Sequence, residues 1–128
     1  LARSADGRRV ATVGEDGTVR VWDPATGEQV RVLTADSGAS GVCFAPDGRR
    51  VASAHDDGAV RVWDVDAGRL VRTLPGPPGG WASRVAWSPD GRWVVGSGTA
   101  DAGFLRVWAA ADGAVAADLP TGGLPVYG

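Results

Sequence analysis

The stretch "GTVRVWDPATG" (17–27) returns as "GAVRVWDVDAG" (58–68) and, with more changes, as "GFLRVWAAADG" (103–113). Each copy carries one tryptophan, and these residues lie 41 and 45 positions apart: Trp22, Trp63 and Trp108. A repeat of 40 to 45 residues with four short segments per unit is typical of β-propeller blades. The stretch therefore predicts three structurally equivalent units.

A tight turn recurs in step with the tryptophans. "ADGR" (5–8) returns as "PDGR" at 46–49 and 89–92, and its aspartates are 41 and 43 residues apart: Asp6, Asp47 and Asp90. The separation of Asp and Trp is 16 residues in the first two units and 18 in the third. We place the two extra residues of the third unit in "GSGTADAGF" (96–104).

The second unit resolves into four expected strands: 40–44, 50–54, 59–64 and 69–74. A Pro-Asp-Gly turn joins the first two, and an Asp-Gly hairpin at 56–58 joins the next two. The last strand is an outer one, with Arg69 and Arg72 expected to reach water. Since no helical period longer than a turn appears, the chain is predicted to be all-β.

Two segments resemble the tryptophan–aspartate (WD) repeat family: "FAPDGRRVASAHDDGAVRVWD" (44–64) and "WSPDGRWVVGSG" (87–98). The resemblance covers essentially the whole chain. It implies an all-β fold of WD-repeat type, in which three four-stranded antiparallel blades form part of a β-propeller. The implied divisions are blade 1 at about 1–34, blade 2 at about 35–75, blade 3 at about 76–120, and the start of a further inner strand at 121–128.

The resemblance also assigns structural residues. The closing pair is present twice and altered once: Trp22-Asp23, Trp63-Asp64 and Trp108-Ala109. In the family, the indole N–H joins a hydrogen-bonded set with a second-strand Ser or Thr, a histidine from a Gly-His pair and a hairpin Asp. Alignment places four residues in this set: Thr12, Ser53, Asp16 and Asp57. The histidine is missing, because "TADSG" (34–38) and "PGPPGG" (75–80) occupy its place, so the hydroxyls or water are expected to accept the indole N–H.

A few residues outside the repeat pattern are of the types found in catalytic or metal sites. "HDDG" (55–58) admits a metal site or a polar hairpin, and the Asp-Gly pair favours the hairpin. His55 is the only histidine, which removes motifs that pair two histidines and leaves no spare base for a triad. Ser97 lacks the strand–turn–helix context of a nucleophile, and Cys43 is expected to be a small core residue. We therefore predict no catalysis, no metal and no cofactor.

Composition and charge limit the classes of partner that we expect. The formal net charge is -2, and the thirteen arginines, with no lysine, are scattered, which argues against nucleic acid. No apolar run is long enough for a membrane span, and no signal-peptide pattern opens the chain. The single cysteine fits a reducing compartment, so a cytoplasmic location is expected. The bias toward Ala, Arg, Gly and Asp is typical of GC-rich bacterial genes.

The resemblance implies a non-enzymatic protein–protein interaction scaffold. Family contact positions precede the hairpin Asp and align with three acidic residues, which favour a basic partner segment: Glu15, Asp56 and Asp101. Candidates at the inner strands are Ser40, Trp81 and Arg84. Trp81 either contacts a partner or, as the favoured reading, packs against its own blade. The alternative function is a sensor or regulatory module of a larger bacterial signalling enzyme, a kinase or NTPase, with its catalytic part outside this chain.

A β-propeller is a closed ring of about 4–8 blades, so the three blades predicted here are too few to close one. Three blades alone would expose two apolar faces. Joined tail to head, "GLPVYG" (123–128) and "LARSADGRR" (1–9) align without a gap to "DSGASGVCFAPDGRR" (36–50). Either the sequence is a piece of a longer propeller, or a second copy completes the strand and a six-bladed ring. The lack of an initiator methionine favours the piece.

Overall fold

A computed structural model describes residues 1–77, 79–99 and 103–119. These residues form three four-stranded antiparallel sheets, here called blades 1 to 3, and no helix occurs among them. Blade 1 contains β1 (Ala2–Arg3), β2 (Val10–Val13), β3 (Thr18–Trp22) and β4 (Gln29–Thr34). Blade 2 contains β5 (Ala39–Phe44), β6 (Arg50–His55), β7 (Val60–Asp64) and β8 (Arg69–Leu74). Blade 3 contains β9 (Trp81–Trp87), β10 (Trp93–Thr99), β11 (Phe104–Ala109) and β12 (Val115–Leu119).

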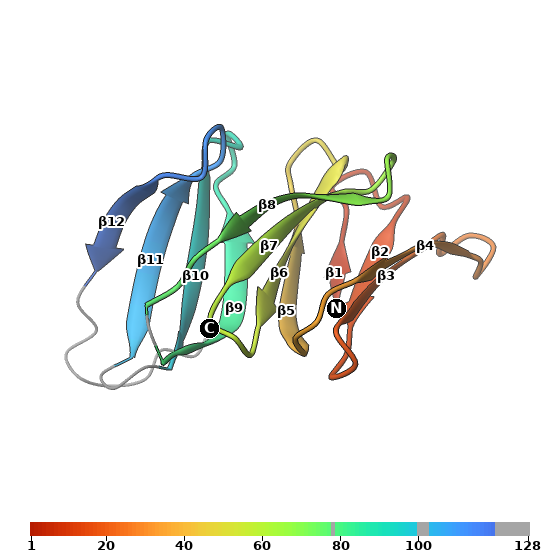
Figure 1. Ribbon diagram of the computed structural model, residues 1–128. Coiled ribbons are helices and arrows are strands. Elements are labelled where there is room, and N and C mark those ends of the chain that lie inside the picture. Colours follow the sequence, from red (N-terminus) through yellow and green to blue (C-terminus); the bar gives the residue numbers. More distant parts are fainter. Residues whose placement is uncertain (78, 100–102, 120–128) are drawn as a thin grey trace.

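The blades lie side by side in chain order, with blade 2 in the middle (Figure 1). Strands follow one another in each sheet, so every neighbouring pair is antiparallel and joined by a short turn. The first strands of successive blades contact one another, β1 with β5 and β5 with β9. The predicted all-β architecture of three four-stranded blades is confirmed, and the strands expected in the second unit agree to within one residue.

Aspartates shape the turns at one end of every blade. In each Asp-Gly turn the Asp carboxylate accepts the backbone N–H two residues on, at 2.9–3.0 Å: Asp6, Asp47 and Asp90. The following glycines have φ between 71° and 75°, a region that disfavours other residues: Gly7, Gly48 and Gly91. The aspartates of the two Trp-Asp pairs cap the next turn in the same way, Asp23 toward Ala25 and Asp64 toward Ala67.

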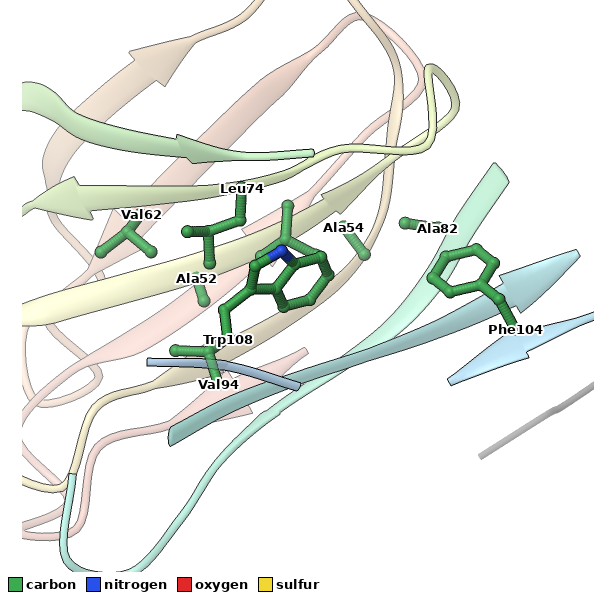
Figure 2. Close-up of a cluster of buried hydrophobic side chains, with 9 residues drawn as sticks. Ala52, Ala54, Val62, Leu74, Ala82, Val94, Phe104 and Trp108 are labelled. Carbon is green, nitrogen blue, oxygen red and sulfur yellow. The ribbon is translucent and has the colours of Figure 1, made fainter. Parts of the chain in front are cut away.

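Between each pair of neighbouring blades lies an apolar core, and a tryptophan of the blade that comes later in the sequence fills it. Trp63, 4% exposed, packs with apolar side chains of blade 1: Ala11, Val19, Val21 and Leu33. Trp108, fully buried, packs with the corresponding side chains of blade 2 (Figure 2): Ala52, Val60, Val62 and Leu74. Burying one such side chain contributes about 2–3 kcal/mol. The tryptophan recurs in the sequence because each blade packs on the one before it.

Blade 3 orients its tryptophan differently. The register position of Thr12 and Ser53 is occupied there by Gly96, which has no side chain to accept a hydrogen bond. A Cβ on Gly96 would lie 2.8 Å from Cζ3 of Trp108, so the ring occupies the space that a side chain would need. The indole N–H instead donates to the carbonyl of Pro75, at 3.2 Å, in the connection between blades 2 and 3.

Two outer-strand arginines join consecutive blades. Arg31 of β4 donates from Nε to the carbonyl of Val65, at 2.9 Å, in the β7–β8 turn. Arg72 of β8 donates to the carbonyls of Ala111 and Asp112, at 2.9 and 2.8 Å, in the β11–β12 turn. Arg72 was expected to reach water; it is half-buried, and its guanidinium also bonds to the turn of the next blade.

Candidate functional site

Four of the six candidate contact residues lie toward one end of the sheets, here called the loop face: Glu15, Ser40, Asp56 and Trp81. It is formed by the hairpins 14–17 and 56–59 and by the interblade connections 35–38 and 75–80, of which residue 78 is not described. Backbone hydrogen bonds tie these segments together, from Ala35 to Gly17 at 2.9 Å and from Ala39 to Gly14 at 3.0 Å. The opposite end carries the first turn of each blade, with Asp6, Asp47 and Asp90, and is called the turn face.

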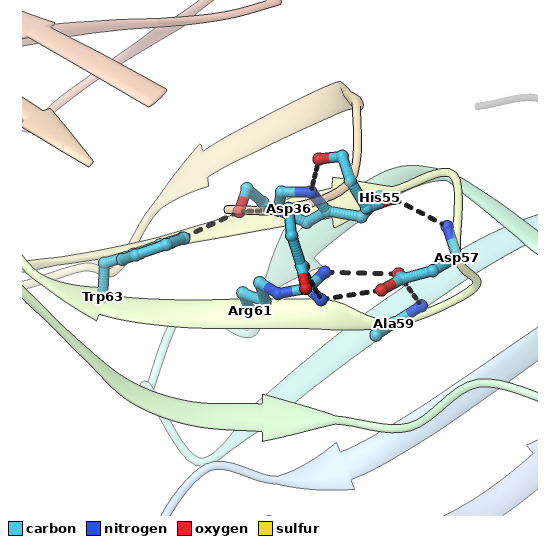
Figure 3. A network of polar contacts seen from close by, with 8 residues as sticks. Asp36, His55, Asp57, Ala59, Arg61 and Trp63 are labelled. Atoms are coloured by element: carbon cyan, nitrogen blue, oxygen red, sulfur yellow. Dashed lines mark hydrogen bonds and ion pairs between the residues drawn. The ribbon is translucent and has the colours of Figure 1, made fainter. Parts of the chain in front are cut away.

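A chain of hydrogen bonds supports the loop face in blade 2 (Figure 3). The Trp63 indole N–H donates to Ser53 Oγ at 2.8 Å, and Ser53 Oγ lies 2.7 Å from His55 Nε2. His55 Nδ1 lies 2.8 Å from the carbonyl of Ser37. A carbonyl only accepts, so Nδ1 carries the proton and Nε2 accepts from the Ser53 hydroxyl. The chain ends where Ser37 Oγ accepts the backbone N–H of Asp57, at 3.1 Å.

His55 supplies the imidazole that was expected to be missing. The predicted hairpin at 55–58 is confirmed, because the N–H of Gly58 donates to the carbonyl of His55 at 3.1 Å. The side chain of His55, the last residue of β6, is however fully buried and is not part of a polar surface. The ring reaches the connection 35–38 from the second strand, whereas the family pattern brings its histidine from the connection itself. Burial, more than any neighbouring charge, holds the pKa of His55 below its usual value, so the ring is neutral near pH 7.

Blades 1 and 3 have fewer of the hydrogen bonds that link tryptophan, hydroxyl and histidine in blade 2. In blade 1, Trp22 donates to Thr12 Oγ1 at 3.0 Å, and no histidine stands behind the hydroxyl among the described residues. Trp22 is also only half-buried. In blade 3 the indole of Trp108 bonds to Pro75, as described above. The loop face is therefore most firmly supported in blade 2.

The hairpin aspartates are held in their ionised form. Asp57 receives both terminal nitrogens of Arg61, at 3.2 and 2.7 Å, and these bonds are the main reason that its pKa lies below the usual value. The same guanidinium lies 3.4 Å from Asp36, whose side chain is 94% exposed. Asp16 accepts from the hydroxyl of Thr18 at 2.6 Å, which lowers its pKa. One largely buried arginine thus supports two carboxylates of the loop face.

Glu15 and Asp56 are exposed and meet the same point of the β4–β5 connection. Asp56 N donates to the carbonyl of Gly38 at 2.9 Å. A Cβ on Gly38 would lie 2.6 Å from Asp56 Oδ2 and 3.0 Å from the Glu15 carbonyl, so both hairpins approach this glycine closely. Sequence reasoning did not single out Gly38 or Asp36, although both lie in the "TADSG" connection.

The remaining candidates lie on the first strands of blades 2 and 3. Trp81 begins β9 and is 64% exposed, so the favoured prediction that it packs against its own blade is wrong. Ser40 is exposed and donates to the carbonyl of Ala82 at 3.2 Å. Arg84 is exposed and lies farther along β9, opposite Ser97. Asp101 lies outside the described residues.

No group of three or more His, Cys, Asp or Glu side chains suited to a metal ion occurs in the described residues. Both ring nitrogens of His55 are engaged by Ser53 and Ser37, so neither is available to a ligand. Within the same residues, no helix is long and apolar enough to cross a membrane.

A hollow of about 1030 Å³ lies at the turn face, between blades 2 and 3. Trp87 and Trp93 line it, together with Arg50 and Ala111. At the equivalent junction of blades 1 and 2, Arg9 pairs with Asp66 at 3.0 Å. Ala111 replaces that aspartate in blade 3, so the matching ion pair does not form.

Comparison with known families agrees with this geometry. The model of the WD domain, G-beta repeat family matches residues 1–23, 27–64 and 68–109. The chain therefore belongs to the WD-repeat family, whose repeats generally mediate protein–protein interactions and whose members are typically non-enzymatic scaffolds. No curated protein matches the chain significantly.

The matched repeats are offset from the blades. The second repeat, 27–64, begins with β4 of blade 1 and ends with β7 of blade 2, and the third, 68–109, spans β8 to β11 in the same way. These two repeats therefore each supply the outer strand of one blade and three strands of the next, whereas the first match, 1–23, covers β1 to β3. The offset joins neighbouring repeats, because the first strand of each later repeat pairs with the last strand of the repeat before it, β4 with β3 and β8 with β7.

Proposed function

We propose that this chain is a protein-interaction scaffold whose loop face binds a basic segment of a partner protein. The observation that carries the proposal is the convergence of Glu15 and Asp56 on Gly38, from hairpins of two different blades. A partner cation placed there would meet the carboxylate of Asp56 and the backbone carbonyl of Glu15, and the exposed side chain of Glu15 adds a second negative charge to the same hairpin region. Electrostatic complementarity of this kind favours association and selects partners by charge.

Two further features support the proposal. Asp36 and Asp16 add exposed carboxylates to the same face, while Arg61 is mostly buried against its acidic partners. Trp81 offers a largely exposed indole at the neighbouring blade, and exposed tryptophans are enriched among residues that dominate binding energy. An arginine side chain that reaches past the carboxylates can stack on this ring.

The test is binding to synthetic peptides that contain Arg and Lys, with the same peptides carrying Gln at those positions as controls. We expect the protein to bind the basic peptides, and the double variant Glu15→Lys, Asp56→Lys to lose at least tenfold in affinity. The matched control is Glu28→Lys, an exposed acid in the β3–β4 turn at the turn face, which should leave the affinity unchanged. Equal affinity of all three proteins would contradict the proposal.

A further inference from the structure

Arg50 in the hollow at the turn face lacks the partner that its counterpart in blade 1 has. Both arginines stand three residues after the turn aspartate of their blade, and Arg9 pairs with Asp66 of the next blade at 3.0 Å. Blade 3 places Ala111 where Asp66 stands in blade 2. Arg50 is half-buried, and a charge partly removed from water is stabilised by an opposite charge beside it.

Two tryptophans of blade 3 form an apolar wall of the same hollow. Trp93 stands at the place that Arg50 has in blade 2, and it is 40% exposed. Trp87 stands at the place of Phe44 and is half-buried. In the part of the chain that the structure describes, Trp87 Nε1 is the buried side-chain nitrogen or oxygen that has no hydrogen-bond partner. The chain's own groups therefore do not complete this wall.

The four aspartates that line the hollow are engaged within the chain. Asp66 pairs with Arg9, and the other three accept backbone N–H groups of their own turns at 2.9–3.0 Å: Asp47, Asp64 and Asp90. Asp64 is the register partner of Arg50 on β7. The backbone N–H of Ala67, more than the charge of Arg50, holds the pKa of Asp64 below its usual value. Each of these carboxylates therefore already has a donor.

Two of the three arginines in the lining are free of such partners. Arg92 lies 3.9 Å from the carboxylate of Asp90. Arg49 and Arg50 form no ion pair with any residue that the structure describes. The hollow therefore offers two guanidinium groups to an incoming anion, next to the exposed indole of Trp93.

We propose that this hollow binds an acidic segment of a partner protein, in which a carboxylate pairs with Arg50 and a neighbouring apolar side chain packs on Trp93. The carboxylate of the partner supplies what Asp66 supplies to Arg9 at the preceding junction. A guanidinium binds a carboxylate through two parallel N–H donors, which makes this pair strong and specific. A hollow of about 1030 Å³ is large enough for a short peptide segment. The site lies at the end opposite the loop face, so the inference does not depend on the proposed binding of a basic segment.

Nuclear magnetic resonance of the indole N–H groups tests the proposal with the capped peptide Glu-Leu-Glu, and with Gln-Leu-Gln as the neutral control. We expect the acidic peptide to shift the resonance of Trp93 and to leave that of Trp81, at the loop face, in place. The neutral peptide should bind about tenfold more weakly, because it cannot form the charged pair. An unshifted Trp93 resonance, or equal affinity for the two peptides, would overturn the proposal. No basic peptide is present in this titration, so its failure leaves the proposed function standing.

Restoring the missing aspartate gives a sharper test of the same site. Ala111→Asp provides Arg50 with a carboxylate from the chain itself, as Asp66 does for Arg9. The acidic peptide should then bind about tenfold more weakly, since it competes with an internal partner. Ala111→Asn, which has a similar size and no charge, should bind like the natural chain. Equal affinity of these two variants would contradict the proposed pairing.

Removing the charge of Arg50 should have the same effect on binding. Arg50→Gln is expected to lower the affinity for the acidic peptide about tenfold. The matched control is Arg8→Gln, which removes an exposed arginine from the first turn of blade 1, outside the hollow, and should leave the affinity unchanged. Equal losses in the two variants would mean attraction by overall charge alone and would overturn the site. Circular dichroism confirms that each variant is folded.

Discussion

Removing the hydroxyl of Ser53 should destabilise the protein far more than removing that of Thr12. Both hydroxyls accept the indole N–H of the tryptophan in their own blade, at 2.8 and 3.0 Å. Ser53 also donates to His55, so Ser53→Ala leaves two buried groups without a partner, the indole N–H and the imidazole Nε2. Thr12→Val keeps the side-chain shape and affects only the half-buried Trp22, which water can reach.

The expected magnitudes follow from this difference. Each orphaned buried group costs about 1–3 kcal/mol, so we expect Ser53→Ala to lower the free energy of unfolding by about 3 kcal/mol. Thr12→Val loses one hydrogen bond near the surface and should cost about 0.5–1 kcal/mol. Urea unfolding followed by tryptophan fluorescence, at one fixed protein concentration, measures both. If Ser53→Ala lowered the free energy of unfolding by no more than Thr12→Val does, the assigned chain of hydrogen bonds would be refuted.

Three further perturbations test other parts of the structure. Because burial lowers the pKa of His55, the unfolded chain binds its proton more readily than the folded protein does. The free energy of unfolding should therefore fall as the pH drops below about 6.5, by at most about 1.4 kcal/mol per pH unit. The urea midpoint of the variant His55→Asn should not show this fall above pH 5. Arg72→Met should lower the unfolding free energy by about 1 kcal/mol through loss of the contacts to blade 3, while Arg69→Met, at an exposed position, should change it by less than about 0.5 kcal/mol. Gly38→Ala should displace the carboxylate of Asp56 and weaken binding of basic peptides, measured by calorimetry; unchanged affinity would place the binding site elsewhere.

Most of the fold could be predicted from the repeat period of the sequence. Three copies of a strand, each with its hairpin glycine and turn aspartate, are enough to place the strands, because turn geometry depends on local sequence. The second unit shows this best, since its four strands lie within a residue of their predicted bounds. The packing role of Trp63 and Trp108 also follows, because a large apolar residue at a fixed register position must face the neighbouring blade.

Contacts between repeats were harder to predict. His55 was missed as the network histidine because alignment searches for it in the interblade connection, whereas here it comes from β6. The contact of Arg72 with the β11–β12 turn joins residues 39 and 40 positions apart, and the rotation of Trp108 depends on the empty space above Gly96. Such contacts become visible only when the blades are placed together in space.

The central claim, that the loop face binds a basic segment, is tested most directly by nuclear magnetic resonance. Each of the six tryptophans has one indole N–H resonance, and two of these residues mark opposite ends of blade 3. Trp81 lies at the loop face and is 64% exposed, and Trp93 lies at the turn face and is 40% exposed. On titration with an arginine-containing peptide, we predict that the Trp81 resonance shifts while that of Trp93 stays in place. A shift of Trp93 with no change at Trp81 would contradict the account.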